Sequence, residues 1–244
     1  MQRPGSHEAA LAKFRAGEVQ VLVGTQMIAK GLDFPNVTLV GVINADTALH
    51  LPDFRASERT FQLVTQVAGR TGRGDRPGRV LVQTFAPDHP AIQAAIQHDY
   101  IRFATQELPI RKLHRYPPTT QLVRIVLRGE NQQQLTHFAE SLTQQIHAGC
   151  KALGMHLDSG LSSIAPPSHL PSSNSSGSTP QAWLRTLGPA PCPIEKLRGK
   201  FRMHLLLTTE SFPLLKSVLK EVQENLPSSE EIQWIVDVDP HDML

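Results

Sequence analysis

The sequence predicts an α/β layer over residues 1–108, with a parallel sheet flanked by helices, followed by a small α+β domain over residues 109–244. In the first part, apolar β-branched runs alternate with amphipathic helical segments, which is typical of a doubly wound layer. In the second part the order is strand, helix, strand, helix, strand, which predicts a domain of the split-βαβ kind.

The elements of the first part follow from hydrophobic periodicity and helix-end signals. The two earliest strands are nearly continuous in apolar character, as strands buried on both faces of a parallel sheet are. Ser57 is the expected N-cap of the helix that follows them. In order, we expect a helix over 8–16, strands over 19–23 and 38–43, a helix over 57–70, a buried strand over 78–85 and a helix over 89–107.

The second part begins with a basic, proline-bearing connection over 108–118. Residues 159–180 are rich in serine, proline and glycine and carry no Asp, Glu, Lys or Arg, so they predict a disordered loop inside the domain. The other expected elements are strands over 122–127, 202–209 and 232–238 and helices over 132–153 and 212–226.

Composition limits the classes of function. A net charge of +2 means that any nucleic-acid surface must be a local basic patch. The sequence contains no run of about 18 apolar residues, so no membrane span is predicted. The N-terminus also lacks the apolar core of a secretory signal. Cys150 and Cys192 form no CxxC pair, which fits a reducing cytoplasm and supplies no zinc site. We therefore expect a cytoplasmic protein.

The most informative segment is 66–74, Gln-Val-Ala-Gly-Arg-Thr-Gly-Arg-Gly. A spacing of three places Arg70 and Arg73 on one side of a helical turn, so both guanidinium groups can face one cleft. Fixed guanidinium groups stabilise the charge that develops on a transferred phosphoryl group. Gly69 allows close approach of the backbone to a ligand. A solvated basic turn is the alternative for this segment taken alone.

A second segment, 24–34, precedes it. It resembles a phosphate-binding P-loop but lacks the second glycine, where Ala29 stands, and the magnesium-binding hydroxyl, where Gly31 stands. If it follows a parallel strand, Thr25 is placed to meet a backbone phosphate, and Gly31 and Asp33 lie nearer a nucleotide. Turn and cap chemistry is the alternative. Asp46 is not part of a Walker B pair, because no acidic residue follows it directly.

A basic cluster leads into the second expected strand of the second part, 202–209. Basic residues interleaved with turns suit contacts with phosphates, although a solvated strand end is the alternative. The cluster consists of Arg185, Lys196, Arg198, Lys200 and Arg202.

These segments resemble the family of bacterial replication-restart helicases, primosomal protein N′. The resemblance is specific to that family and covers nearly the whole chain apart from 159–180. It is carried by residues 24–37, 45–46, 51–55, 58–63, 66–74, 116–118, 188–191, 197–202 and 236–240.

The resemblance implies an ATP- and Mg²⁺-dependent 3′-to-5′ DNA helicase that recognises stalled forks, contacts single-stranded-DNA-binding protein and assembles the primosome. Residues 1–108 would belong to the second, RecA-like lobe of the motor. Residues 109–244 would form a DNA-binding domain. The family roles implied are nucleotide-facing arginines at Arg70 and Arg73, coupling by Gln66, nucleotide contact by Gly31, Asp33 and Gly69, and DNA contact by Thr25, Gln26, Lys30, Lys196, Arg198, Lys200 and Arg202.

Several family features are absent from this sequence: the P-loop lysine, the acidic Walker B pair, the zinc-binding cysteines and the N-terminal DNA-binding domain. The expectation is that the chain begins partway into the second lobe, as a truncated product or as a split subunit that works with a separate N-terminal half. Alone, it would be a DNA-binding module without catalysis.

A metal-dependent nuclease is a weaker alternative. It would use Asp237, Asp239 and Asp242 with His204 or His241, since clustered carboxylates can hold Mg²⁺. Surface acids near a C-terminus explain these residues more simply.

We predict that Arg70→Ala abolishes ATP turnover in an assembled full-length motor while DNA binding is kept, because the guanidinium group acts on the transferred phosphoryl group. Phosphate release and DNA affinity, measured on the same preparation, check this. Unchanged turnover would remove Arg70 from the catalytic set.

Overall fold

The computed structural model describes residues 6–25, 37–69, 78–159, 182–225 and 231–243. The chain divides into two compact units, one of residues 1–51 and 55–107 and the other of residues 52–54 and 108–244. The insert expected at 159–180 lies outside the described residues except for Ser159, which ends a strand.

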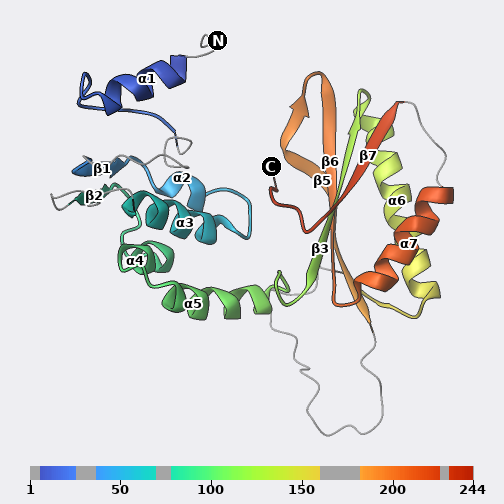
Figure 1. The fold of residues 1–244 in the computed structure, drawn as a ribbon. Helices are drawn as coiled ribbons and strands as arrows, with labels where there is room; N and C mark the ends of the chain where they lie inside the picture. Colours follow the sequence, from blue (N-terminus) through green and yellow to red (C-terminus); the bar gives the residue numbers. More distant parts are fainter. Residues whose placement is uncertain (1–5, 26–36, 70–77, 160–181, 226–230, 244) are drawn as a thin grey trace, which may run out of the picture. The chain divides into compact units, whose positions relative to one another are not determined.

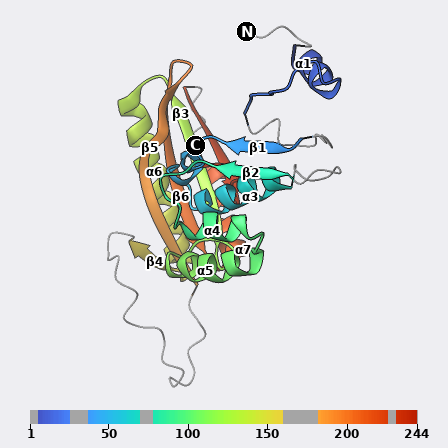
Figure 2. The ribbon, with the colours of Figure 1, turned by 90° about the vertical axis from the view of Figure 1, so that its left-hand side faces the viewer.

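The first unit contains a parallel pair of strands, β1 (Leu39–Val42) and β2 (Arg79–Val82), aligned in register from Leu39 opposite Arg79. Helix α3 (Ala56–Ala68) runs along one face of the pair (Figure 2). Phe61 and Val64 of α3 pack with the alanines of α4 (Pro90–Ile96) and with Phe103, and Val82 of β2 lies against this cluster. The other helices that lie wholly in this unit are α1 (Ser6–Arg15) and α2 (Asp46–Leu49). The predicted parallel sheet is therefore confirmed.

The strand predicted over 19–23 does not form. These residues are irregular, and Val21 and Val23 are 74% and 82% exposed. A segment becomes a strand only when its backbone groups pair with a neighbour, and within the described residues this one has no ladder partner. The apolar run gave these residues a propensity for strand, but no neighbouring strand pairs with them in the described structure.

The expectation that the strands are buried on both faces is also wrong for the described residues. Leu39 and Leu81 are more than half exposed, while alternate residues of both strands are half-buried. A two-stranded sheet covered on one side by α3 can bury only the side chains that point to that helix.

Two helix boundaries differ from the expectation. Helix α3 begins after Arg55, which makes no side-chain cap bond, so Ser57 is a helical residue and not the N-cap. The helix expected over 89–107 is two helices, α4 and α5 (Tyr100–Leu113). They separate because His98 has φ 54, in the left-handed region, and Asp99 caps a new helix by accepting a bond from the Arg102 N–H at 2.9 Å.

Helix α5 continues to Leu113 with Pro109 inside it, so the predicted connection at 108–118 begins as helix. Its last residues belong to the second unit. Among the described helices, none is both long and apolar enough to span a membrane.

The second unit is a five-stranded sheet in the order β4-β5-β6-β3-β7. Helices α6 (Gln132–Ala152) and α7 (Phe212–Asn225) lie on one face of it (Figure 1). Leaving out β4, the order β-α-β-β-α-β and the antiparallel ladders are those of the predicted split-βαβ fold, which is confirmed. The strands are β3 (Gln121–Gly129), β4 (His156–Ser159), β5 (Trp183–Leu197), β6 (Lys200–Thr209) and β7 (Ile232–Val238).

The core of this unit lies between the sheet and the two helices. Alternate residues of β3 and β6, such as Ile125 and Leu205, point to α6 and α7 and are fully buried. Asn131 caps α6 by accepting bonds from two backbone N–H groups, so the helix begins close to the end of β3. The period of two in the strands and of 3.6 in the helices places these apolar faces together.

The sequence did not predict strands β4 and β5. Strand β5 contains Pro189, Pro191 and Pro193, which normally exclude a central strand. It tolerates them because β4 pairs with it only from Trp183 to Thr186, so beyond that point one edge of β5 has no partner strand in the described structure. Proline has no backbone N–H, but on an unpaired edge this removes no hydrogen bond from the ladder.

We predict that Gly149→Ala destabilises the second unit, although alanine favours a helix by about 1 kcal/mol over glycine. A Cβ at Gly149 of α6 would stand 2.8 Å from Val218 Cγ1 of α7, and overpacking of this kind costs about 1–3 kcal/mol. Trp183 and Trp234 are the two tryptophans and both lie in this unit, so urea unfolding followed by their fluorescence measures the loss.

The control is Val218→Ala. The double variant should lose less than the sum of the two single losses, because the smaller side chain makes room for the new methyl group. Additive losses, or a Gly149→Ala protein as stable as the wild type, would contradict the close contact.

Candidate functional site

Most of the residues expected to contact a nucleotide lie outside the described part of the chain, as do two of the expected DNA contacts. Their roles stay predictions. They are Gln26, Lys30, Gly31, Asp33, Arg70 and Arg73.

Two members of the first motif are described, at the C-terminal end of α3. Gln66 is half-buried on the last turn, and Gly69 ends the helix with its N–H donated to the Thr65 carbonyl at 3.1 Å. The helix thus leads directly into the arginine segment. Thr25 is exposed in irregular chain.

The carboxyl ends of β1 and β2 are joined by Asp46. One of its oxygens accepts a bond from the Thr84 hydroxyl at 2.7 Å and the other from the Phe85 N–H at 2.8 Å. The hydrogen bond from Thr84 is the largest cause that lowers the pKa of Asp46, and the bond from Phe85 is the next. Both oxygens are therefore engaged within the unit, and Asp46 fixes the chain between β1 and α2 to the end of β2.

In the second unit, the predicted basic residues lie on the β5–β6 hairpin. Strand β5 ends at Leu197 and β6 begins at Lys200, so Arg198 and Gly199 form a two-residue turn. Their φ angles are 51 and 83, as a type I′ turn requires. Arg198 is exposed at the turn and Lys200 is half-buried beside it.

The other two predicted residues of the hairpin are engaged within the protein. The Lys196 Nζ lies 4.4 Å from the centre of the Phe201 ring. Arg202 is only 6% exposed, and its guanidinium group donates to the Ile194 carbonyl at 3.4 Å. Of the four predicted cations, Arg202 is therefore buried, Lys196 and Arg198 are exposed, and Lys200 is half-buried.

Sequence reasoning missed a set of cations on the face of the sheet opposite the helices. Arg124 and Arg128 of β3 point to this face together with Arg202 and His204 of β6, since Arg128 pairs with Arg202 in the antiparallel register. Arg124 is 3% exposed. The signal was available: two arginines at an even spacing in an otherwise apolar strand share one face.

The guanidinium groups on this face hold peripheral segments. Arg124 donates to the Asp242 carbonyl at 2.9 Å, which fixes the chain after β7 across the sheet. Its other terminal nitrogen lies 3.9 Å from Cys192 Sγ of β5. Arg185 donates to the His114 carbonyl at 3.2 Å. These contacts give the face a structural role.

His204 lies among these cations. Burial, and then the positive charges of Arg124 and Arg202, lower the pKa of His204 to about 4. The imidazole is therefore neutral at physiological pH.

A metal-dependent nuclease finds no support. The described residues hold no group of three His, Cys, Asp or Glu side chains that could bind a metal ion. Asp239 instead accepts a bond from the Leu122 N–H at 3.4 Å.

Comparison with known families matches both units. Residues 112–241 match the family model described as the primosomal protein N C-terminal domain. Residues 3–75, which include both sequence motifs, match the helicase conserved C-terminal domain. The chain belongs to the primosomal protein N C-terminal domain family.

Curated relatives of this family named replication restart protein PriA align along nearly the whole chain. That of Bacillus subtilis (strain 168) is 36% identical over 245 residues, covering 99% of this chain and 27% of the relative. That of Synechocystis is 38% identical over 239 residues, covering 98% and 25%. That of Haemophilus influenzae is 38% identical over 245 residues, covering 99% and 29%. The resemblance drawn from the sequence is confirmed, and the chain spans between a quarter and a third of the length of these relatives.

We predict that the stability of the primosomal C-terminal unit falls between pH 6.5 and about 4 through His204. The unfolded imidazole takes up a proton near pH 6.5, while in the folded protein its pKa is about 4, so the unfolded state binds more protons in this window. Allowing for solvent screening, the loss is about 1–2 kcal/mol.

His204→Gln should lack this part of the pH dependence. The measurement is the urea unfolding free energy, followed by tryptophan fluorescence at steps from pH 7 to pH 4 for both proteins. Parallel curves for the variant and the wild type would show that His204 does not titrate as described.

Proposed function

We propose that the chain is the C-terminal part of an ATP-dependent DNA helicase that moves 3′ to 5′, recognises stalled replication forks and directs primosome assembly. The observation that carries the proposal is the order of the two family matches: a helicase C-terminal region containing both motifs, followed by the primosomal domain. In this proposal residues 1–108 are part of the second motor lobe and residues 109–244 form a DNA-binding domain.

The proposed chemistry assigns a stabilising role to the arginine segment. Arg70 and Arg73 would neutralise charge on the γ-phosphoryl oxygens, while Gly31, Asp33 and Gly69 approach the nucleotide. The described end of α3 supports this: Gly69 ends the helix without a side chain, and Gln66 lies on the last helical turn, four residues before Arg70 in the sequence. In this proposal Gln66 couples nucleotide binding to DNA binding.

DNA would be held by both parts of the chain. Thr25, Gln26 and Lys30 would contact the translocating strand in the motor lobe. In the second unit, the candidates are Lys196, Arg198, Lys200 and Arg202. Exposure supports Arg198 most directly, because a phosphate needs access to the cation. Lys200 is half-buried beside it, and Lys196 is exposed with its ammonium group over the Phe201 ring.

The proposed cofactors are ATP and Mg²⁺, the metal serving to neutralise charge on the phosphates. This chain would complete their site rather than build it, because its sequence has no P-loop lysine or acidic Walker B pair. Zinc is not proposed, since the chain has only Cys150 and Cys192, both buried.

The proposed partners follow from the family. They are forked and single-stranded DNA, single-stranded-DNA-binding protein, primosome proteins and an N-terminal motor half supplied in the same or a separate polypeptide. We propose the cytoplasm as the place of action, where replication occurs in bacteria.

A non-catalytic DNA-binding module is the second candidate for this chain by itself. The absence of a phosphate-binding loop from the sequence favours it, because the arginine segment has no nucleotide to act on without that loop.

We predict that the purified chain binds forked DNA but hydrolyses no ATP. Phosphate release is measured with and without forked DNA, and binding is measured by fluorescence anisotropy on the same sample. A full-length restart helicase serves as the positive control for turnover, and Arg70→Ala as the control for any turnover by the chain.

Two outcomes would count against the proposal. DNA-stimulated turnover that Arg70→Ala removes would mean that the chain has a nucleotide site of its own. Failure to bind forked DNA at low salt would remove the DNA-binding role of the second unit.

A further inference from the structure

We infer that the end of the β5–β6 hairpin, residues 192–201, is a β-ribbon that enters a groove of duplex DNA. Arg198 and Lys200 would contact phosphates, and Ile194 and Leu197 would lie against the apolar parts of the groove. This inference rests on the proposed DNA-binding function and assigns it to one element and one form of DNA.

The hairpin end has a defined shape. Its two-residue turn has both φ angles positive, which matches the twist of the flanking strands and fixes the register of Leu197 opposite Lys200. The next pair along the ribbon is Lys196 opposite Phe201, and the ammonium group of Lys196 lies over the Phe201 ring. A two-stranded ribbon of this kind fits a major groove about 12 Å wide.

A bulge broadens one side of the ribbon. Pro191 pairs with Met203 and Lys196 with Phe201, so the four residues 192–195 of β5 lie opposite Arg202 alone. Two side chains of the sheet hold the bulge in place. Arg202 donates to the Ile194 carbonyl, and a guanidinium nitrogen of Arg124 lies near Cys192 Sγ. Gln132 at the start of α6 lies 3.4 Å from Glu195 Oε1, so the acid in the bulge has a partner within the protein.

The bulge and the end of β5 present apolar side chains near Arg198 and Lys200. Ile194 and Leu197 are each 46% exposed. In a major groove, apolar side chains contact the methyl groups of thymine, while neighbouring cations contact the phosphates.

Duplex DNA fits the hairpin end better than a single strand does. Proteins that bind single strands without sequence preference stack bases on exposed aromatic rings. Phe201 is the aromatic residue of the hairpin end, and it is partly buried against the core and covered by Lys196. The ring is therefore not offered as a stacking platform.

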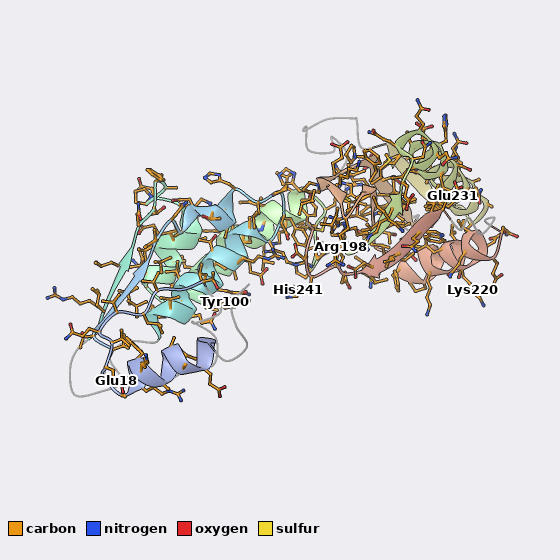
Figure 3. All side chains as sticks on the ribbon, turned by 90° about the horizontal axis from the view of Figure 1, so that it is seen from above. Glu18, Tyr100, Arg198, Lys220, Glu231 and His241 are labelled. Carbon is orange, nitrogen blue, oxygen red and sulfur yellow. The ribbon has the colours of Figure 1, made fainter. Side chains whose placement is uncertain are left out.

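The test uses the whole chain and the double variant Arg198→Asn with Lys200→Gln. Asparagine tolerates the left-handed conformation at position 198, so the turn is kept while the charge is lost. The matched control removes two lysines from α7, Lys216→Gln with Lys220→Gln. Figure 3 shows Lys220 well apart from Arg198.

Binding to a labelled blunt duplex and to one of its strands is measured by anisotropy over a range of salt concentrations. If both cations contact phosphates, the slope of log affinity against log salt for the duplex falls in magnitude by about 1.8 in the hairpin variant. The α7 control keeps the wild-type slope. Leu197→Ser weakens duplex binding without changing the slope, because it removes an apolar contact.

A hairpin variant that binds the duplex like the α7 control, while the wild-type chain does bind DNA, would overturn the hairpin assignment and leave the proposed function standing. Equal losses on the duplex and on the single strand would overturn the choice of duplex. A wild-type chain that binds neither DNA would overturn both proposals.

Discussion

Strand β3 is the constraint on which the second unit depends, because it is paired along both edges and covered on both faces. Its backbone bonds to β6 on one side and to β7 on the other. On one face, Val123, Ile125 and Leu127 meet α6 and α7. On the other face, Leu122 and Arg124 are also buried. A strand in this position cannot shift by one residue, because that would exchange arginines with the core.

Burying arginines is costly unless their donors are used, and the second unit uses them to attach its periphery. Arg124 holds the chain after β7, Arg202 holds the bulge of β5, and Arg185 holds the turn after α5. The same turn is tied to β4 by Arg115, which pairs with Asp158 at 2.7 Å and lies over the Trp183 ring. Segments far apart in sequence are thus fixed to one sheet by cations, and the hairpin that we assign to DNA rests on this framework.

Much of the second unit was predictable from the sequence. The largely apolar run at residues 122–127 and the amphipathic pattern of residues 132–153 indicated β3 and α6, and the family resemblance was carried by contiguous residues. Strand β5 was not predictable, because prolines in alternate positions argue against a strand unless its outer edge is open. Helices α4 and α5 were merged because the left-handed conformation of His98 leaves no mark on hydrophobic periodicity. The strand expected over 19–23 failed because propensity does not supply a partner.

The sequence by itself determined the family, the split-βαβ class of the second domain without its strand β5, and the presence of a basic cluster before residues 202–209, since each of these depends on residue types and their spacing. Only the tertiary structure decided which cations of the cluster can meet a ligand. Arg198 and Arg202 are alike in sequence, but one stands at a turn with positive φ and the other lies beneath a bulge. The exposure of a side chain depends on the register of its strand and on which segments pack over that strand. The local sequence determines neither of these.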